Sequence, residues 1–170
     1  MKKFKANKQA GFTLIELVIV LVIMGVLGAA IAAFRGGADF QSLKKQTSDG
    51  ISLIASDARA KKGAGNYNVI TDISVLCNDG YLTETMCGTG NDGVGTNPFG
   101  GDWVVAPSTN FGAAHLSVGV TGIPDGRFAE LADTLAGQSY KACQSSTDCA
   151  SITVTEPQEN GAGGEIYIDI

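Results

Sequence analysis

This chain of 170 residues nearly lacks histidine, the side chain that most often serves as a general acid or base in enzymes. It has a single histidine, His115, and no G-x-S-x-G sequence, so we expect no hydrolase or metal centre built around histidine. The cysteines, at positions 77, 87, 143 and 149, show neither a C-x-x-C redox motif nor zinc-ribbon spacing. Because no convergent set of catalytic residues is found, we expect no enzyme, no cofactor and no bound metal.

Charged side chains are also scarce, at 17% of the sequence, whereas glycine is abundant with 23 residues. This mixture is typical of a small secreted fold rich in turns, and the apolar fraction of 44% excludes wholesale disorder. The net charge is −5, and it becomes −9 when the lysine-rich residues 1–11 are left out. No cluster of Lys and Arg stands out after residue 62, so nucleic acid is not favoured as a partner of the folded part.

One long apolar run is present, over residues 12–34, and Glu16 is the only acid in it. As a helix it would be about 35 Å long, which is enough to cross a bilayer. Four lysines precede it, which predicts that residues 1–11 stay cytoplasmic and that the rest of the chain lies outside. The alternative is a cleaved secretory signal peptide, but the run exceeds the usual length of about 7–15 residues and no A-x-A site follows.

Glu16 needs an explanation, because inserting a carboxylate into a membrane costs about 2.5–3.5 kcal/mol. The sequence around it, Gly11 followed by FTLIEL, resembles the class III signal of the type IV pilin superfamily. Gly11 precedes the cut, Phe12 follows it, and Glu16 is the fifth mature residue. The resemblance implies that a prepilin peptidase cuts between Gly11 and Phe12, methylates the new amine of Phe12 and leaves the apolar segment in place. It is very strong over residues 5–34 and weaker beyond.

The resemblance also implies a role for Glu16 in assembly. In a helical stack of subunits, the Glu16 carboxylate of one chain pairs with the Phe12 amine of its neighbour. The low dielectric between packed helices strengthens this pairing, which offsets much of the desolvation cost of both groups. The alternative is a Glu16 side chain that extends alone toward the lipid headgroups.

The resemblance therefore predicts the major subunit of a type IV pilus, which assembles with copies of itself into a secreted helical filament. The precursor would sit in the inner membrane as a single-pass protein, where it meets the prepilin peptidase and the pilus assembly machinery. Cell adhesion, twitching, aggregation and DNA uptake are the roles open to such a filament. The alternatives are a type II secretion pseudopilin, a minor or DNA-uptake pilin and, more distantly, a membrane-anchored secreted enzyme.

Beyond the apolar run, the sequence predicts a second, amphipathic half of the same helix. Apolar or small residues recur at helical spacing at positions 40, 43, 47, 51, 54 and 58. Lys61 and Lys62 suit a helix C-terminus, and Gly63 suits its end. We therefore expect a leader at 1–11, one helix over 12–62 with a membrane segment at 12–34, and a globular head at 63–170.

Alternating apolar residues predict four strands in the head, at 102–106, 114–120, 151–156 and 165–170. Between the second and third, an apolar stripe predicts a helix within 124–137 that ends at Gly137. Residues 63–101 are expected to be loop-like. The predicted class is α+β, with an antiparallel sheet packed on the amphipathic half of the long helix, as in a pilin head. The segments GNY, NPFGGDW and GIPDGRF resemble type IVb pilins, whereas the short leader and Phe12 resemble type IVa.

Four cysteines behind a membrane segment favour disulfides, and three pairings are possible. We favour the local pairs, Cys77–Cys87 and Cys143–Cys149, because each encloses a short turn rich in Asp and Gly or in Ser and Thr.

Three further features of the head have ordinary explanations. The side chains at 91, 92, 97 and 102 offer oxygens to a calcium ion, but their spacing matches no calcium motif, so a solvated turn is expected. The G-x-G-x-x-G sequence at 88–93 has no strand before it and no helix after it, so we attribute it to chance. Trp103 is expected in the core or at an intersubunit contact.

Overall fold

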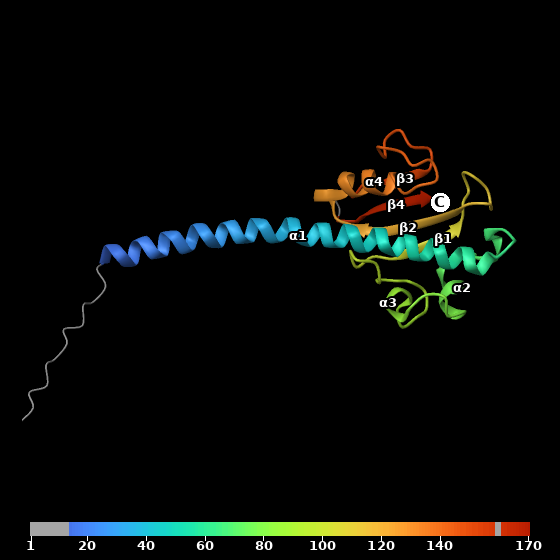
Figure 1. Ribbon diagram of the computed structural model, residues 1–170, viewed down its shortest axis with the longest axis horizontal. Coiled ribbons are helices and arrows are strands. Elements are labelled where there is room, and N and C mark those ends of the chain that lie inside the picture. Colours follow the sequence, from blue (N-terminus) through green and yellow to red (C-terminus); the bar gives the residue numbers. More distant parts are fainter. Residues whose placement is uncertain (1–13, 159–160) are drawn as a thin grey trace, which may run out of the picture. The chain divides into compact units, whose positions relative to one another are not determined.

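The computed structural model describes residues 14–158 and 161–170, except for the side chains of residues 28–38. The elements follow in the order α1 (Leu14–Lys62), η1 (Tyr67–Val69), α2 (Ile73–Asn78), α3 (Glu84–Cys87), β1 (Trp103–Pro107), β2 (Leu116–Ile123), η2 (Asp125–Arg127), α4 (Phe128–Ala136), β3 (Ile152–Thr155) and β4 (Gly164–Asp169) (Figure 1). The chain divides into two compact units, residues up to 39 and residues from 40 onward, which are described separately.

Helix α1 ends where the sequence predicts. Its last turn contains Arg59, Lys61 and Lys62, whose positive charges interact favourably with the helix dipole. Gly63 follows with a φ of 55°, a conformation that glycine adopts without strain, and its N–H donates to the carbonyl oxygen of Arg59 at 3.2 Å. From residue 40 onward, one face of the helix is buried, with Ile54 and Ala58 wholly inaccessible to solvent. The predicted amphipathic half is therefore the part of α1 that builds the core.

The four strands form one antiparallel sheet in the order β1-β2-β4-β3. Val118 in the centre pairs with Val105 on one side and with Ile168 on the other, and all three side chains are buried. Gly119 points to the opposite face, where a Cβ atom would lie 2.5 Å from a ring carbon of Tyr167, so only glycine allows this approach. Alternate residues of the strands thus face one core, as the period of two predicts.

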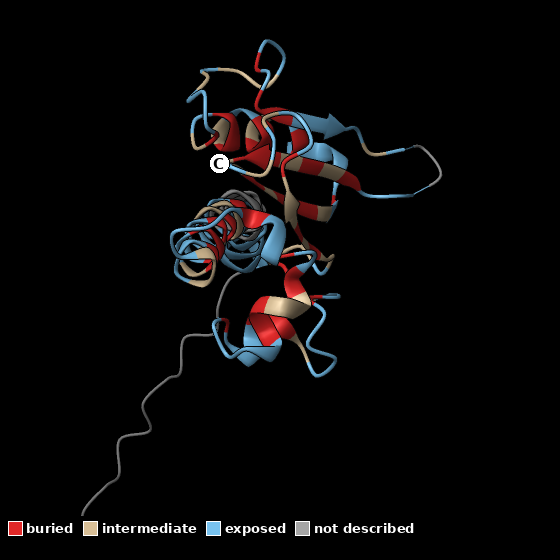
Figure 2. Cartoon of the chain, turned by 90° about the vertical axis from the view of Figure 1, so that its right-hand side faces the viewer, coloured by how far each residue is buried: buried red, intermediate tan, exposed pale blue. Residues whose placement is uncertain are grey.

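The buried side chains of the sheet, α1, α2 and α4 join in a single core (Figure 2). Helix α4 lies against β3 and β4, while α2 contacts β1 (Figure 1). The predicted α+β class is therefore confirmed. Each predicted strand corresponds to an observed one, with ends that differ by up to three residues, and β2 continues past a register shift between Val120 and Ile123.

The prediction that residues 63–101 are loop-like was wrong in part, because η1, α2 and α3 lie there. Helices α2 and α3 have six and four residues, too few for a repeating apolar stripe to be visible in the sequence. Local capping begins α2, where the Asp72 carboxylate accepts the Ser74 N–H at 2.8 Å. Burial then holds the segment, since Ile73, Leu76 and Met86 all belong to the core.

Candidate functional site

Glu16 lies in the first described turn of α1. It is exposed, as is every other residue from 14 to 27. Gly11 and Phe12, the residues expected at the cleavage point, lie outside the described residues.

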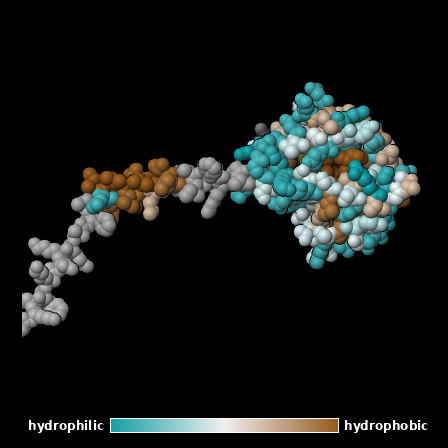
Figure 3. All heavy atoms as spheres, in the orientation of Figure 1, coloured by the Kyte–Doolittle hydropathy of each residue, from teal (hydrophilic) through white to brown (hydrophobic). Residues whose placement is uncertain are grey.

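Apolar side chains surround Glu16 on all sides of the helix. The large ones between Leu14 and Leu27 are 47–83% exposed, and Figure 3 shows this stretch in brown. A helix that is apolar all round is normally buried in a larger protein assembly or in lipid. Within the part of the chain that the structure describes, no helix is long and apolar enough to span a bilayer. The expected membrane segment, 12–34, includes residues 12 and 13, which lie outside that part.

A comparison with known protein families identifies this segment. The model of the prokaryotic N-terminal methylation motif matches residues 6–32. The chain carries the class III signal of type IV pilins. The match includes Gly11, Phe12 and Glu16, and it stops before the compact unit that begins at residue 40. No curated protein matches the chain significantly.

The motif supports a pilin-like or pseudopilin-like structural protein. It implies processing by a prepilin peptidase, methylation of the new N-terminus and a membrane-anchored precursor that enters a pilus.

The compact unit from residue 40 onward contains two disulfides, Cys77–Cys87 and Cys143–Cys149, which are the local pairs that the sequence favours. The first joins α2 to the end of α3, and the second closes the Ser- and Thr-rich loop that follows α4. That loop is also held to α4 by Asp133, whose carboxylate accepts the backbone N–H of Ser146 at 2.7 Å. This hydrogen bond is the main reason why the pKa of Asp133 lies below its ordinary value.

Asn97 organises the loop that was considered for calcium. Its side-chain nitrogen donates to the carbonyl oxygens of Asp102, at 3.0 Å, and Thr121, at 2.8 Å. Its Oδ1 accepts the N–H groups of Phe99, at 2.9 Å, and Gly101, at 3.0 Å. One buried amide thus joins the loop to both chains of the β1–β2 pair, at the end where β1 begins. The sequence signal for this role is the Asn-Pro pair at 97–98, which is typical of turns, but it does not reveal the partners.

Two of the other calcium candidates, Asp92 and Asp102, also accept backbone N–H groups, whereas the Asn91 side chain donates to that of Asn78 at 3.3 Å. An oxygen of Asp102 accepts the Gly95 N–H at 2.8 Å, and an oxygen of Asp92 accepts the Val94 N–H at 3.1 Å. Among the described residues, no group of three or more acidic, Cys or His side chains is placed to hold a metal ion.

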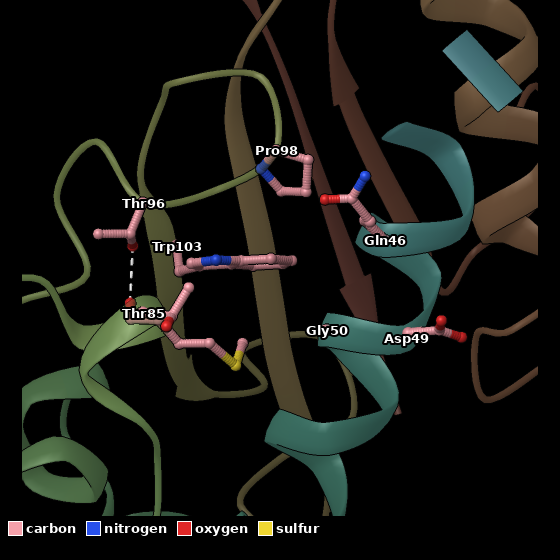
Figure 4. A pocket seen from close by; sticks show the side chains of 8 residues that line it. Gln46, Asp49, Gly50, Thr85, Thr96, Pro98 and Trp103 are labelled. Carbon is pink, nitrogen blue, oxygen red and sulfur yellow. Dashed lines mark hydrogen bonds between the residues drawn. The ribbon is translucent and has the colours of Figure 1, made fainter. Parts of the chain in front are cut away.

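Trp103 lies in the core of the compact unit, 3% exposed, rather than on its surface. The end of its ring points toward Gly50 on α1, where a Cβ atom would lie 2.8 Å from the ring (Figure 4). A cavity of about 280 Å³ opens beside this contact, with Gln46 and Pro98 at its border. Thr96 and Met86 also line this cavity, and the Thr96 hydroxyl donates to the Met86 carbonyl oxygen at 2.6 Å. Gly50 is therefore a packing requirement that the sequence alone does not reveal.

Glu130 on α4 connects that helix to α1. It accepts hydrogen bonds from Lys44 at 2.9 Å, from Gln41 at 3.1 Å and from Arg127 at 3.1 Å. The Lys44 ammonium is the main reason why the pKa of Glu130 lies below its ordinary value. Arg127 also lies over the ring of Phe40, 5.1 Å from its centroid. We call these four side chains around Glu130 the Glu130 cluster.

Proposed function

We propose that this protein is the major structural subunit of a type IV pilus. The observation that carries the proposal is Glu16, which lies five residues after Gly11 inside the matched motif, on a helix whose surrounding side chains are apolar and exposed. An enzyme needs a site that holds reacting groups, whereas this arrangement offers a surface that must be covered by similar helices or by lipid.

In the proposed mechanism, residues 1–11 are a leader that a prepilin peptidase removes at the Gly11–Phe12 bond. Residues 12–34 remain as the membrane segment of the waiting subunit. During assembly these segments leave lipid and pack together in the centre of the filament. The compact unit, with the proposed head at 63–170, forms the filament surface.

Glu16 selects the position of the next subunit in this mechanism. Its carboxylate meets the positively charged N-terminal amine of Phe12 on a neighbouring chain. Both charges are costly to bury alone, and pairing them between apolar helices removes most of that cost. A subunit that is out of register leaves the charges unpaired. The ion pair therefore stabilises only one axial displacement between neighbouring subunits.

Processing is tested by replacing Gly11. Gly11→Val places a bulky, branched side chain directly before the cut, so we expect an unprocessed chain of higher mass in the membrane. Intact-mass analysis of the wild-type subunit should show a chain that begins at Phe12 and carries one added methyl group. A wild-type filament subunit that still includes residues 1–11 would contradict the proposal.

The major-subunit assignment is tested by mass spectrometry of filaments sheared from the source cells. We expect this chain to be the dominant component. If it is instead a trace component of filaments made from another pilin, it is a minor pilin. If it is absent from them and protein secretion fails in its deletion mutant, it is a pseudopilin.

A further inference from the structure

Basic side chains are unevenly distributed in the compact unit. After residue 62 the chain has only two, Arg127 and Lys141. Arg127 is paired with Glu130, at 3.1 Å, and Lys61 on α1 is paired with Asp79.

Three basic side chains at the end of α1 and after α4 are not neutralised in this way. Arg59, Lys62 and Lys141 form no ion pair with any carboxylate among the described residues. Residues 12–170 have a net charge of −9, so carboxylates outnumber basic side chains in this part of the sequence. Three basic side chains without a carboxylate partner are therefore unexpected. They attract an anion from outside the chain.

Two adjoining cavities are both bordered by Arg59 and Ile170. Lys141 borders neither of them, but its ammonium lies 4.9 Å from the centre of the Tyr140 ring in the wall of the larger one. The larger, of about 270 Å³, has Lys62, His115 and Tyr140 in its wall. The smaller, of about 180 Å³, has Gln138 in its wall. Taken together they reach the lower part of the range of ligand sites, which is roughly 300–1,000 Å³.

Aromatic rings form one side of the larger cavity. The rings of His115 and Tyr140 lie 4.1 Å apart between centroids, and Phe111 packs edge-on against both. The Lys62 ammonium lies 4.5 Å from the centre of the Tyr67 ring. Rings next to cations suit a ligand that has a flat apolar face as well as a negative charge.

One residue in the wall of the smaller cavity, Gln138, has a side-chain oxygen without a hydrogen-bond donor in the described part of the chain. The Gln138 side-chain nitrogen donates to the Ser48 hydroxyl, but Gln138 Oε1 is buried and accepts from no group in the described part of the chain. Buried acceptors of this kind normally have a partner. A small turn of the Gln138 side chain would bring its amide to the cavity, where a ligand hydroxyl suits either orientation of the amide because a hydroxyl both donates and accepts.

We propose that the two cavities bind an acidic sugar, such as a uronic acid unit of a polysaccharide. The sugar carboxylate would pair with Arg59 and Lys62, the ring face would lie against Tyr140 and His115, and a hydroxyl would meet Gln138. A free phosphate would leave Gln138 and the aromatic rings unused. A nucleic acid would bring many charges close to an acidic surface. The proposal concerns the compact unit alone and does not depend on pilus assembly.

The test is calorimetric titration of the full-length chain in non-ionic detergent with a galacturonic acid trisaccharide. We expect saturable binding that neutral maltotriose does not reproduce. Arg59→Ala and Gln138→Leu should each weaken it about tenfold, since each removes one directional contact. Lys45→Ala is the matched control, because Lys45 is an exposed α1 lysine that pairs with Asp49 outside the cavities, and it should leave binding unchanged.

Melting temperatures of the variants show whether each one folds. Gln138→Glu provides a second, isosteric variant that should also weaken binding, because it brings a negative charge next to the sugar carboxylate. No saturable binding to the folded wild-type chain would overturn the proposal. So would equal affinity for inorganic phosphate, or tighter binding to oligothymidine than to the trisaccharide. If Lys45→Ala loses as much affinity for the trisaccharide as Arg59→Ala does, the proposal is also overturned, because binding then depends only on the total charge.

Discussion

Glu16 is the residue on which the proposed assembly mechanism depends, and replacing it should separate folding from assembly. In Glu16→Val, the compact unit from residue 40 onward should be unaffected, because Glu16 lies outside it. The neighbouring Phe12 amine would lose its partner in the filament centre, a penalty of about 3–5 kcal/mol for a broken buried pair. We therefore expect normal subunit levels in a membrane immunoblot but few or no filaments by electron microscopy.

The matched variant is Glu16→Asp, which keeps the charge but shortens its reach. Filament numbers should fall between those of wild type and Glu16→Val. Wild-type numbers of filaments in Glu16→Val, at a normal subunit level, would contradict the pairing mechanism.

Asn97 gives a second prediction at the level of a single residue. Asn97→Ala removes two hydrogen bonds to Asp102 and Thr121 and two within the loop, and it leaves buried backbone groups without partners. We expect a loss of roughly 1–3 kcal/mol in the free energy of unfolding. Asn97→Asp should be no better, since an acceptor would then face two carbonyl oxygens. Asn68→Ala is the control, because Asn68 is exposed.

Urea unfolding of the three variants measures these differences. If Asn97→Ala is as stable as Asn68→Ala, the amide does not hold the loop.

The Glu130 cluster connects two helices, α1 and α4, that are far apart in the sequence. Lys44 and Gln41 on α1 both donate to a carboxylate on α4. The folded state lowers the pKa of Glu130 below its ordinary value of 4.5. Its contribution to stability is therefore fully present above that value and is lost as the pH falls through the lower, folded pKa.

Glu130→Gln should accordingly lower the melting temperature at neutral pH, and the difference from wild type should shrink below about pH 4. Asp49→Asn is the control, because Asp49 forms an exposed pair within α1 only, with Lys45. Melting curves between pH 3 and pH 7 test this. A difference that persists unchanged at pH 3 would show that the carboxylate charge is not responsible.

Elements with a repeating pattern could be predicted from the sequence, and isolated short ones could not. The end of α1 was predicted because Lys61, Lys62 and Gly63 act locally. The strands were predicted because one buried face imposes a period of two. Helices α2 and α3 are too short to show a period, and their positions depend on burial against β1 and on a disulfide.

The candidate sites show the same division. The motif around Glu16 is continuous in the sequence, so it could be recognised there. The partners of Glu130 and Asn97 are far from them along the chain. Gln41 is 89 residues from Glu130, and Thr121 is 24 residues from Asn97. Contacts of this kind depend on how the elements pack, which no local pattern encodes.

The two disulfides act on the stability of the whole compact unit, and their effect can be measured. The bonds join residues 10 and six positions apart, and loops of this length should each contribute about 2–3 kcal/mol in the chain-entropy model. They belong to opposite ends of the unit, since the first joins α2 to α3 beside β1 and the second follows α4. Because the two loops do not overlap in sequence, the losses in Cys77→Ala/Cys87→Ala and in Cys143→Ala/Cys149→Ala should add. Urea unfolding of both double variants and of their combination tests the sum, and non-reducing peptide mapping of the wild type tests the pairing. A peptide that links Cys77 to Cys143 or to Cys149 would refute both the local pairs and the expected additivity.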